Sequence, residues 1–278
     1  MLALYHQTCR QCSKVITNAY STSFSLGIKS LAKRLHDPIY SIYAYVRFAD
    51  EIVDTFHHKD KKKLLDEFKA DTYKALEEEI SLNPVLHAFQ EVVNEYQIDH
   101  ALIEAFLHSM EMDLYFDSYQ QEGYETYIYG SAEVVGLMCL KIFVEGNQKK
   151  YDELKDSARK LGAAFQKVNF LRDLKDDVDE RGRVYFPGVD FTSFNSNAKK
   201  AIEADIEKDF DEAYEGIKRL PIGARRGVYL AYTYYRRLFS KIRSLTPEVI
   251  KNERVRVPNG KKLYLLMKTY VQYQLNVF

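Results

Sequence analysis

Two pairs of aspartates have a spacing that could hold metal ions. Asp50 and Asp54 lie four residues apart, and Asp173 and Asp177 repeat this spacing, with Asn169 one turn before Asp173. On a helix, residues at i and i+4 share one face, with Cβ atoms about 5–6 Å apart. Two carboxylates held this close and partly buried repel each other. Two such pairs make little sense for stability alone. They make sense in a site where bound cations neutralise the carboxylates.

The ligand types favour magnesium. A lone D-x-x-x-D pair is more often a solvated acidic edge, but the second pair changes that balance. Mg²⁺ prefers oxygen ligands and commonly combines one or two carboxylates with substrate phosphate oxygens. No histidine or cysteine accompanies the aspartates, which disfavours zinc and iron, and the chain has no G-x-x-x-x-G-K loop. The pattern predicts two facing helices that clamp a diphosphate through Mg²⁺, with Mn²⁺ as a substitute.

Arginines accompany both pairs. Arg47 precedes Asp50 by one turn, and Arg172, Arg181 and Arg183 flank the second pair. A guanidinium can hold phosphate oxygens in a bidentate grip. The alternative is that these arginines are ion-pair partners of the aspartates, and for Arg172 that alternative has at least equal weight.

The aromatic content suggests a reaction class. The chain has 22 tyrosines and 16 phenylalanines but no tryptophan. A diphosphate clamped by cations is a good leaving group, and its loss from an allylic carbon leaves a carbocation. Aromatic rings around a dry cavity stabilise such a cation and keep water away.

The elements that must position these residues are predicted to be helices. Asp37 and Pro38 are typical of an N-cap and a first helical residue, and apolar residues at i, i+3, i+4 and i+7 spacing over 39–56 predict a long amphipathic helix. No stretch shows the alternation of a strand. We expect an all-α protein with one domain over residues 1–278. Further helices are predicted at 61–80, 84–96, 99–116, 132–145, 149–179, 198–219, 223–245 and from Lys261.

Composition narrows the partners and the compartment. Forty basic residues balance 40 acidic ones, which argues against a nucleic-acid binder or a general binder of anionic membranes. The N-terminus lacks a signal-peptide pattern, and the longest apolar run, 134–140, is far shorter than the roughly 20 residues of a spanning helix. Cys9, Cys12 and Cys139 fit a reducing compartment, and we interpret the first two as ordinary helix residues. We expect a cytoplasmic protein.

Five blocks together resemble the squalene and phytoene synthases. They keep that family's order and approximate spacing over most of the chain, and the fourth is the strongest. The blocks are YSTSFSLG at 20–27, IYAYVRFADEIVD at 42–54, YIYGSAEVVG at 127–136, QKVNFLRD at 166–173 and RGRVYFP at 181–187.

The resemblance implies an isoprenoid synthase fold, all-α around a central cavity, and assigns roles by matching position. Asp50, Asp54, Asp173 and Asp177 would bind Mg²⁺–diphosphate, with Asn169 as a further ligand. Contacts to diphosphate or to the reacting carbons would come from Ser21, Tyr43, Arg47, Tyr127, Gln166 and Tyr185. Phe24, Val135 and Gly136 would line the apolar channel. Tyr235 and Arg254 match a C-terminal diphosphate-contacting pair if a small gap is allowed.

Within the family, the block RGRVYFP and Tyr20 favour the phytoene synthase type. That type joins two C20 geranylgeranyl diphosphates through a cyclopropylcarbinyl diphosphate and needs no NADPH. Squalene synthase (two C15 farnesyl diphosphates with NADPH) and dehydrosqualene synthase (C15 without NADPH) stay open, as does the oligomeric state. The substrates and products are lipids, so we expect weak peripheral membrane contact.

Other classes fit the residues less well. Some proteins similar to this family assist the assembly of respiratory complexes without known catalysis, but here the whole metal-binding set is present. The N-x-x-R-D-x-x-x-D motif and the block RGRVYFP argue against a head-to-tail prenyltransferase and a terpene cyclase.

Overall fold

The helix that carries the first aspartate pair lies in the middle of a helical assembly. The computed structural model describes residues 1–115, 120–181, 183, 185–189 and 194–255, and within them no strand occurs. The first pair lies on α3, His36–Asp54, which has Pro38 in its first turn. Its buried residues include Ile42, Tyr45 and Ala49, at helical spacing. The amphipathic helix and the all-α class that the sequence predicts are therefore confirmed.

The predicted start of α3 was wrong. A 3₁₀ turn, Lys33–Leu35, leads directly into the helix, which begins at His36, so that Asp37 lies inside the first turn and is not the N-cap. Leu35 already has α-helical backbone angles, so the chain enters α3 without the extended residue that an aspartate cap requires. At its actual position the Asp37 carboxylate lies near the positive end of the helix dipole.

Most of the remaining helices match the predicted ranges to within a few residues. These are α4 (Lys61–Glu78), α5 (Pro84–Tyr96), α6 (His100–Tyr115), α8 (Val134–Phe143), α9 (Gln148–Arg181), α10 (Ser196–Arg219) and α11 (Ile222–Arg243). Four were not predicted as separate elements: α1 (Leu2–Tyr20), α2 (Thr22–Lys29), α7 (Gln121–Ile128) and α12 (Pro247–Asn252). Cys9 and Cys12 lie on α1 as free thiols. The predicted helix from Lys261 falls outside the described residues.

Local sequence explains several helix starts. The side chains of Asp60, Asn83 and Asn195 each accept a hydrogen bond from a backbone N–H in the first turn of α4, α5 and α10. Ser21 does the same for α2, where its Oγ accepts from the Phe24 N–H at 3.2 Å. Such caps satisfy N–H groups that have no partner within the helix. Ser21 therefore separates α1 from α2 and fixes the direction in which α2 leaves.

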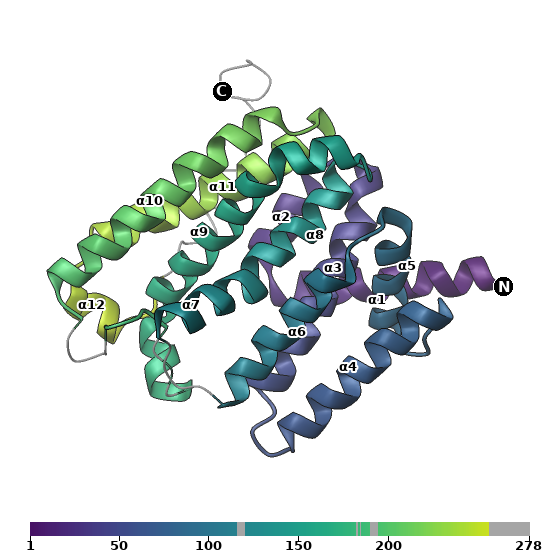
Figure 1. Cartoon of the computed structure of the whole chain (residues 1–278), viewed down its shortest axis with the longest axis horizontal. Coiled ribbons are helices and arrows are strands. Elements are labelled where there is room, and N and C mark those ends of the chain that lie inside the picture. The colour runs from purple at the N-terminus through teal and green to yellow at the C-terminus, as the bar shows by residue number, and fades with distance from the viewer. Residues whose placement is uncertain (116–119, 182, 184, 190–193, 256–278) are drawn as a thin grey trace.

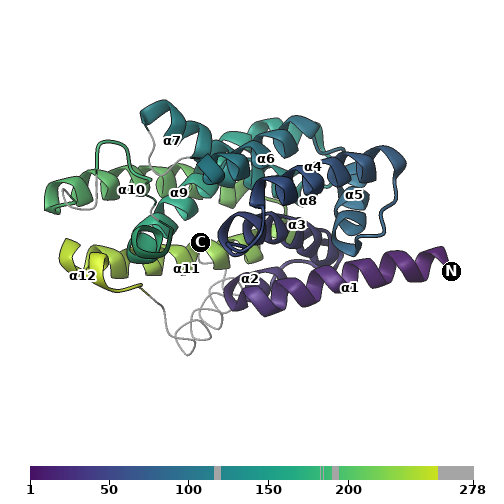
Figure 2. The same cartoon turned by 90° about the horizontal axis from the view of Figure 1, so that it is seen from below.

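The helices pack in two groups around a shared middle. At one end α9, α10 and α11 run side by side, and at the other α4 and α5 pack against each other and against α3 (Figure 1). α8 packs on both α3 and α9 and so joins the two groups. Turned by 90°, the molecule shows α1 and α2 on the face opposite α7 (Figure 2). The buried apolar residues follow this division: one cluster centres on α3, α5 and α6, and another on α9, α10 and α11.

A π-helical turn, Tyr129–Glu133, connects α7 to α8 and allows a close approach to α6. It contains Gly130, where an added Cβ would lie 2.4 Å from the Ala105 carbonyl oxygen and 2.7 Å from the Ser109 Cβ. π-Helical turns inside α-helices are rare and are frequent at functional sites. This turn places Tyr127 and Val135 on either side of a fixed contact with α6.

Replacing Gly130 should destabilise the protein. We expect Gly130→Ala to lower the free energy of unfolding by about 1–3 kcal/mol, because a backbone carbonyl cannot move aside for the new methyl group. Gly27→Ala is the matched control, since its Cβ would meet its nearest neighbour at 3.9 Å and alanine favours a helix by about 1 kcal/mol over glycine. Chemical denaturation of both variants measures the difference; equal stabilities would contradict the close approach.

Candidate active site

One cavity of about 870 Å³ runs between α2, α3, α8, α9 and α11. All the site residues that the sequence predicts line it: Ser21, Phe24, Tyr43, Arg47, Asp50, Asp54, Tyr127, Val135, Gly136, Gln166, Asn169, Asp173, Asp177, Tyr185, Tyr235 and Arg254. Their shared location is a finding; the role of each stays a prediction. Ligand pockets commonly measure about 300–1,000 Å³, so this volume lies near the upper end of that range.

The first aspartate pair occupies the last turns of α3. Asp54 Oδ1 accepts a hydrogen bond from Arg183 Nη1 at 3.0 Å. Asp50 Oδ2 lies 3.9 Å from Arg47 Nη1, and the other terminal nitrogen of Arg47 pairs with Glu51. Arg47 Nε is buried and has no hydrogen-bond partner among the residues that the structure describes. Arg47 thus brings positive charge to the cavity wall one turn before the carboxylates, as the spacing predicts.

The second pair lies on α9, with two guanidiniums against one carboxylate. Asp173 Oδ1 is 2.9 Å from Arg172 Nε and 2.8 Å from Arg254 Nε. Arg254 also reaches Asp176 Oδ2 with Nη1 at 3.4 Å. Burial opposes the charge of Arg172, but the hydrogen bond and charge of Asp173 outweigh it and raise the pKa of this guanidinium. In the structure Arg172 is therefore an ion-pair partner of Asp173, as the alternative interpretation predicts.

Two tyrosine hydroxyls add to the polar end of the cavity. Tyr235 donates a hydrogen bond to Asn169 Oδ1 at 3.2 Å, so the predicted amide ligand is held by a side chain from α11. Burial raises the pKa of Tyr235 and that of Tyr43, which keeps both hydroxyls protonated at neutral pH. Asn169 is thereby oriented before any ligand binds.

Sequence reasoning missed Asp113, which lies at the end of α6 and joins the two halves of the site. Arg183 donates to the Asp113 carbonyl oxygen at 2.8 Å and lies 3.4 Å from its Oδ1, and Tyr127 donates to its Oδ2 at 2.9 Å. Burial outweighs the lowering effects of Arg183 and Tyr127 and raises the pKa of Asp113 to about 7. Since Arg183 also binds Asp54, this network connects the first aspartate pair to α6 and α7.

A signal for Asp113 was present in the sequence. It follows Phe106 and Met110 at helical spacing, so a carboxylate falls on the buried face of a predicted helix. A buried carboxylate requires a positively charged or hydrogen-bonding partner. Arg183 was assigned to the flank of the second pair, and the structure places it on the first. The side chain of Arg181 lies outside the described residues.

Aromatic rings form the wall next to the charged end. Phe170 and Tyr185 stack with centroids 4.1 Å apart, and Tyr127 stacks on Tyr185 at 5.2 Å. On another wall Phe165 stacks on Tyr235 at 3.9 Å. Ring faces carry partial negative charge and stabilise a nearby cation by roughly 0.5–2 kcal/mol each.

The remainder of the cavity is apolar and long. On α9 the lining extends from Leu154 to Asp177, and between Leu154 and Asp173 the helix advances about 28 Å. Gly136 lines this part and also sets its width: a Cβ there would lie 2.9 Å from the Ala158 carbonyl oxygen, so α8 and α9 pack closely. One end is therefore charged and the other is suited to a hydrocarbon chain.

Comparison with known proteins gives the family. The squalene/phytoene synthase family model matches residues 17–261. The chain belongs to the squalene/phytoene synthase family. Members of this family are prenyltransferases that act on prenyl diphosphates, so the enzyme class that the resemblance implies is confirmed at that level.

Curated relatives of two types are similar to this chain. It is 27% identical to a 15-cis-phytoene synthase of Synechocystis sp., with 97% of this chain and 86% of the relative covered. It is 28% identical to a 4,4'-diapophytoene synthase of Staphylococcus haemolyticus, over 73% of this chain and 70% of the relative.

Solved structures confirm the fold. A dehydrosqualene synthase bound to a ligand matches with a TM-score of 0.82 and 23% identity, covering 97% of this chain and 98% of that one. A squalene synthase from Alicyclobacillus acidocaldarius matches with a TM-score of 0.75 and 19% identity, covering 87% of this chain and 95% of that one. The isoprenoid synthase fold that the resemblance implies is therefore confirmed.

One stretch of the described chain is long and apolar enough to span a membrane by length and composition. It is Gln121–Phe143, which combines α7, the π-helical turn and α8, and half of its most apolar window is buried inside the protein. It lines the cavity through Tyr127, Val135 and Gly136. A core helix of a soluble protein passes the same test of length and composition.

The hydroxyl of Tyr127 should stabilise the fold through Asp113. We expect Tyr127→Phe to cost about 1–3 kcal/mol of unfolding free energy, because the buried carboxylate loses a hydrogen bond. Tyr124→Phe is the control, since Tyr124 is buried beside Phe170 and Phe186 without contacting Asp113. Thermal and chemical denaturation measure both variants. A loss of the same size in the two would show that the hydrogen bond to Asp113 contributes nothing.

Proposed function

We propose that this protein is a phytoene synthase type of enzyme, which joins two geranylgeranyl diphosphates head to head in carotenoid biosynthesis. The observation that carries the proposal is the division of one cavity into a carboxylate end, an aromatic wall and a long apolar end. A diphosphate fits the first, a carbocation the second and prenyl chains the third. The curated phytoene synthases support the C20 substrate.

Asp50, Asp54, Asn169, Asp173 and Asp177 would hold Mg²⁺. The set fits that ion because it consists of oxygen donors on two helices that line the same cavity. Bound Mg²⁺ neutralises the diphosphate and makes it a better leaving group. Mn²⁺, which takes similar ligands, would substitute.

The side chains of this protein would bind and orient both substrates. Arg47 and Arg254 are positively charged groups at the polar end that can grip phosphate oxygens. Ser21, Gln166 and Tyr235 would orient them through hydrogen bonds, and Phe24 and Val135 would pack against the chains. The apolar and aromatic part of the lining would keep water from the cation, which water would otherwise quench.

The reaction has two steps. In the first, the allylic C–O bond of one substrate breaks, diphosphate leaves with the electron pair, and the double bond of the second substrate attacks the cation; loss of a proton closes a cyclopropane. In the second, the remaining diphosphate leaves, the cation rearranges to a linear skeleton, and loss of a proton gives the C40 hydrocarbon. No reductant is consumed. The rings of Tyr127, Phe170 and Tyr185 would stabilise the cations.

The second candidate is condensation of two C15 farnesyl diphosphates. It is favoured by the 4,4'-diapophytoene synthase relative and by the match to a dehydrosqualene synthase structure. The reacting ends of C15 and C20 substrates are identical, so the polar end of the cavity serves either.

Product analysis distinguishes these candidates. Purified protein with Mg²⁺ is incubated with geranylgeranyl or farnesyl diphosphate, with and without NADPH, and hydrocarbons are identified by mass. We expect a C40 product without NADPH. A C30 product would replace phytoene synthase by dehydrosqualene synthase, or by squalene synthase if NADPH is required. A folded protein that condenses neither substrate would contradict the enzyme proposal.

Loss of one predicted ligand should abolish most of this activity. We expect Asp173→Ala to lower kcat by at least about 10²-fold, the scale of losing one group that stabilises developing charge. Asp71→Ala, on the exposed face of α4, is the matched control. Chelation of divalent ions should stop the wild-type reaction, and added Mg²⁺ or Mn²⁺ should restore it. Turnover that survives both Asp173→Ala and chelation would rule out the assigned metal site.

A further inference from the structure

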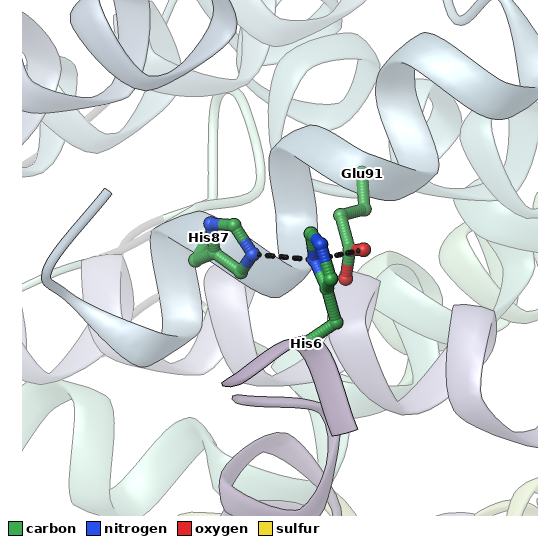
Figure 3. A group of neighbouring side chains, drawn as sticks. All are labelled: His6, His87 and Glu91. Atoms are coloured by element: carbon green, nitrogen blue, oxygen red, sulfur yellow. Dashed lines mark hydrogen bonds and ion pairs between the residues drawn. The ribbon is translucent and has the colours of Figure 1, made fainter. Parts of the chain in front are cut away.

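A second group of potential metal ligands lies on α1 and α5, outside the cavity. His6 comes from α1, and His87 and Glu91 come from one face of α5 (Figure 3). None of the three lines the cavity described above. His6 Nδ1 lies 2.9 Å from His87 Nε2 and 2.6 Å from Glu91 Oε1. All three ligand atoms lie within 4.8 Å of one another, and no other such group of histidine, cysteine and acidic side chains occurs in the described part of the chain.

Protons alone do not satisfy this arrangement. The backbone N–H of Ser81 donates to His87 Nδ1 at 3.3 Å, which places the ring proton of neutral His87 on Nε2, pointing at His6 Nδ1. His6 Nδ1 must then present its lone pair to His87 and also to the carboxylate oxygen of Glu91. If His6 Nδ1 carries a proton instead, it can donate to Glu91, but it then opposes the N–H of His87. Each distribution leaves one unfavourable contact.

Burial limits the access of water to this group, most of all at His87. The side chain of His87 is completely buried, and those of Glu91 and His6 are 15% and 27% exposed. Burial also lowers the pKa of His87 below its usual value, so its imidazole is neutral, the form that binds metals. The partial exposure of His6 leaves a path by which an ion can reach the group.

We propose that His6, His87 and Glu91 bind one divalent transition-metal ion, with Zn²⁺ as the best match. Two histidines and one glutamate, with a fourth position open to water, are a common zinc set. A tetrahedral ion with bonds of about 2.0–2.1 Å sets its ligand atoms roughly 3.3 Å apart. His6, at the exposed edge of the group, must therefore withdraw to admit the ion, by roughly 0.4 Å from His87 Nε2 and roughly 0.7 Å from Glu91 Oε1.

One neighbouring side chain supports such a site, while one backbone contact opposes it. Arg10 donates to both oxygens of Glu91, at 2.9 and 3.2 Å, and so orients the carboxylate. Binding through Nε2 moves the proton of His87 to Nδ1, so the Ser81 N–H must give up its 3.3 Å hydrogen bond. A group that holds a metal ligand as Arg10 holds Glu91 affects metal affinity by about 10–100-fold.

The two sites differ in ligand chemistry and therefore in ion. The cavity offers oxygen donors, which suit Mg²⁺, whereas imidazole nitrogens suit Zn²⁺. The ion would join α1 to α5, two helices that pack against each other near the N-terminus. α1 leads through Tyr20 and Ser21 directly into the cavity wall. We infer a structural ion that holds α1 in place, a role independent of the proposed reaction.

The test is Zn²⁺ binding to the full chain in excess Mg²⁺, which would compete with Zn²⁺ for the carboxylates of the cavity. We expect one Zn²⁺ per chain by competition with a chromogenic chelator, and a higher Tm with Zn²⁺ than with chelator, because an ion that binds only the folded state stabilises it. Co²⁺ should give the visible spectrum of nitrogen and oxygen ligation, without the thiolate absorption that binding to Cys9 or Cys12 would produce.

Variants connect the binding to this group. His6→Ala and Glu91→Gln should each weaken Zn²⁺ binding at least about tenfold and remove the Zn²⁺-dependent rise in Tm. His58→Ala, an exposed histidine in the loop before α4, is the control and should change neither. Circular dichroism shows whether each variant folds. The proposal would be overturned if the wild type failed to bind Zn²⁺, or if folded His6→Ala bound it unchanged. The group would then be a hydrogen-bonded contact between α1 and α5.

Discussion

Repulsion among carboxylates in one cavity is the constraint on which this structure depends. Asp50, Asp54, Asp173 and Asp177 line the same space, and Asp113 is buried beside them. Without ligand, guanidiniums offset that charge: Arg183 binds Asp54 and Asp113, while Arg172 and Arg254 bind Asp173. A buried charge without a partner would cost several kcal/mol, so each aspartate pair requires arginines from other segments. The positions of residues 183 and 254 follow from this electrostatic need.

The helices pack closely where the cavity is apolar. Gly136 brings α8 close to α9, and Gly162 of α9 lies against the π-helical turn, with each missing Cβ facing a carbonyl oxygen of the opposite segment. At the charged end, aromatic side chains such as Phe165 and Phe170 stand between helices instead. Glycine contacts thus limit the width of the hydrocarbon end, and stacked rings line the charged end. Within one set of helices, glycines therefore set the shape of the cavity, and charged and aromatic residues set its electrostatics.

Much of the candidate site could be predicted from the sequence because its main residues follow helical spacing. Asp50 with Asp54, and Asn169 with Asp173, share faces of helices that apolar periodicity identifies. The partners of the aspartates could not be predicted, since they depend on tertiary contacts: Arg183 lies beside the second pair in sequence and binds the first in space. The predicted start of α3, with Asp37 as the N-cap, was wrong because the preceding turn already has helical backbone angles. Family resemblance supplied Tyr235 and Arg254, which no local pattern connects to the aspartates.

The arginine contacts also bear on how the proposed reaction could begin. A diphosphate that enters with cations would compete with the aspartates for these arginines. Arg254 is suited to that exchange: its side chain is 40% exposed and pairs with Asp173 and Asp176, so moving it toward phosphate oxygens costs little desolvation. Arg183 is 8% exposed and held by Asp113 as well as Asp54, so its displacement would leave a buried charge unpaired. On these grounds Arg254 would change partners when substrate and cations bind, while Arg183 would stay in place and keep Asp54 oriented.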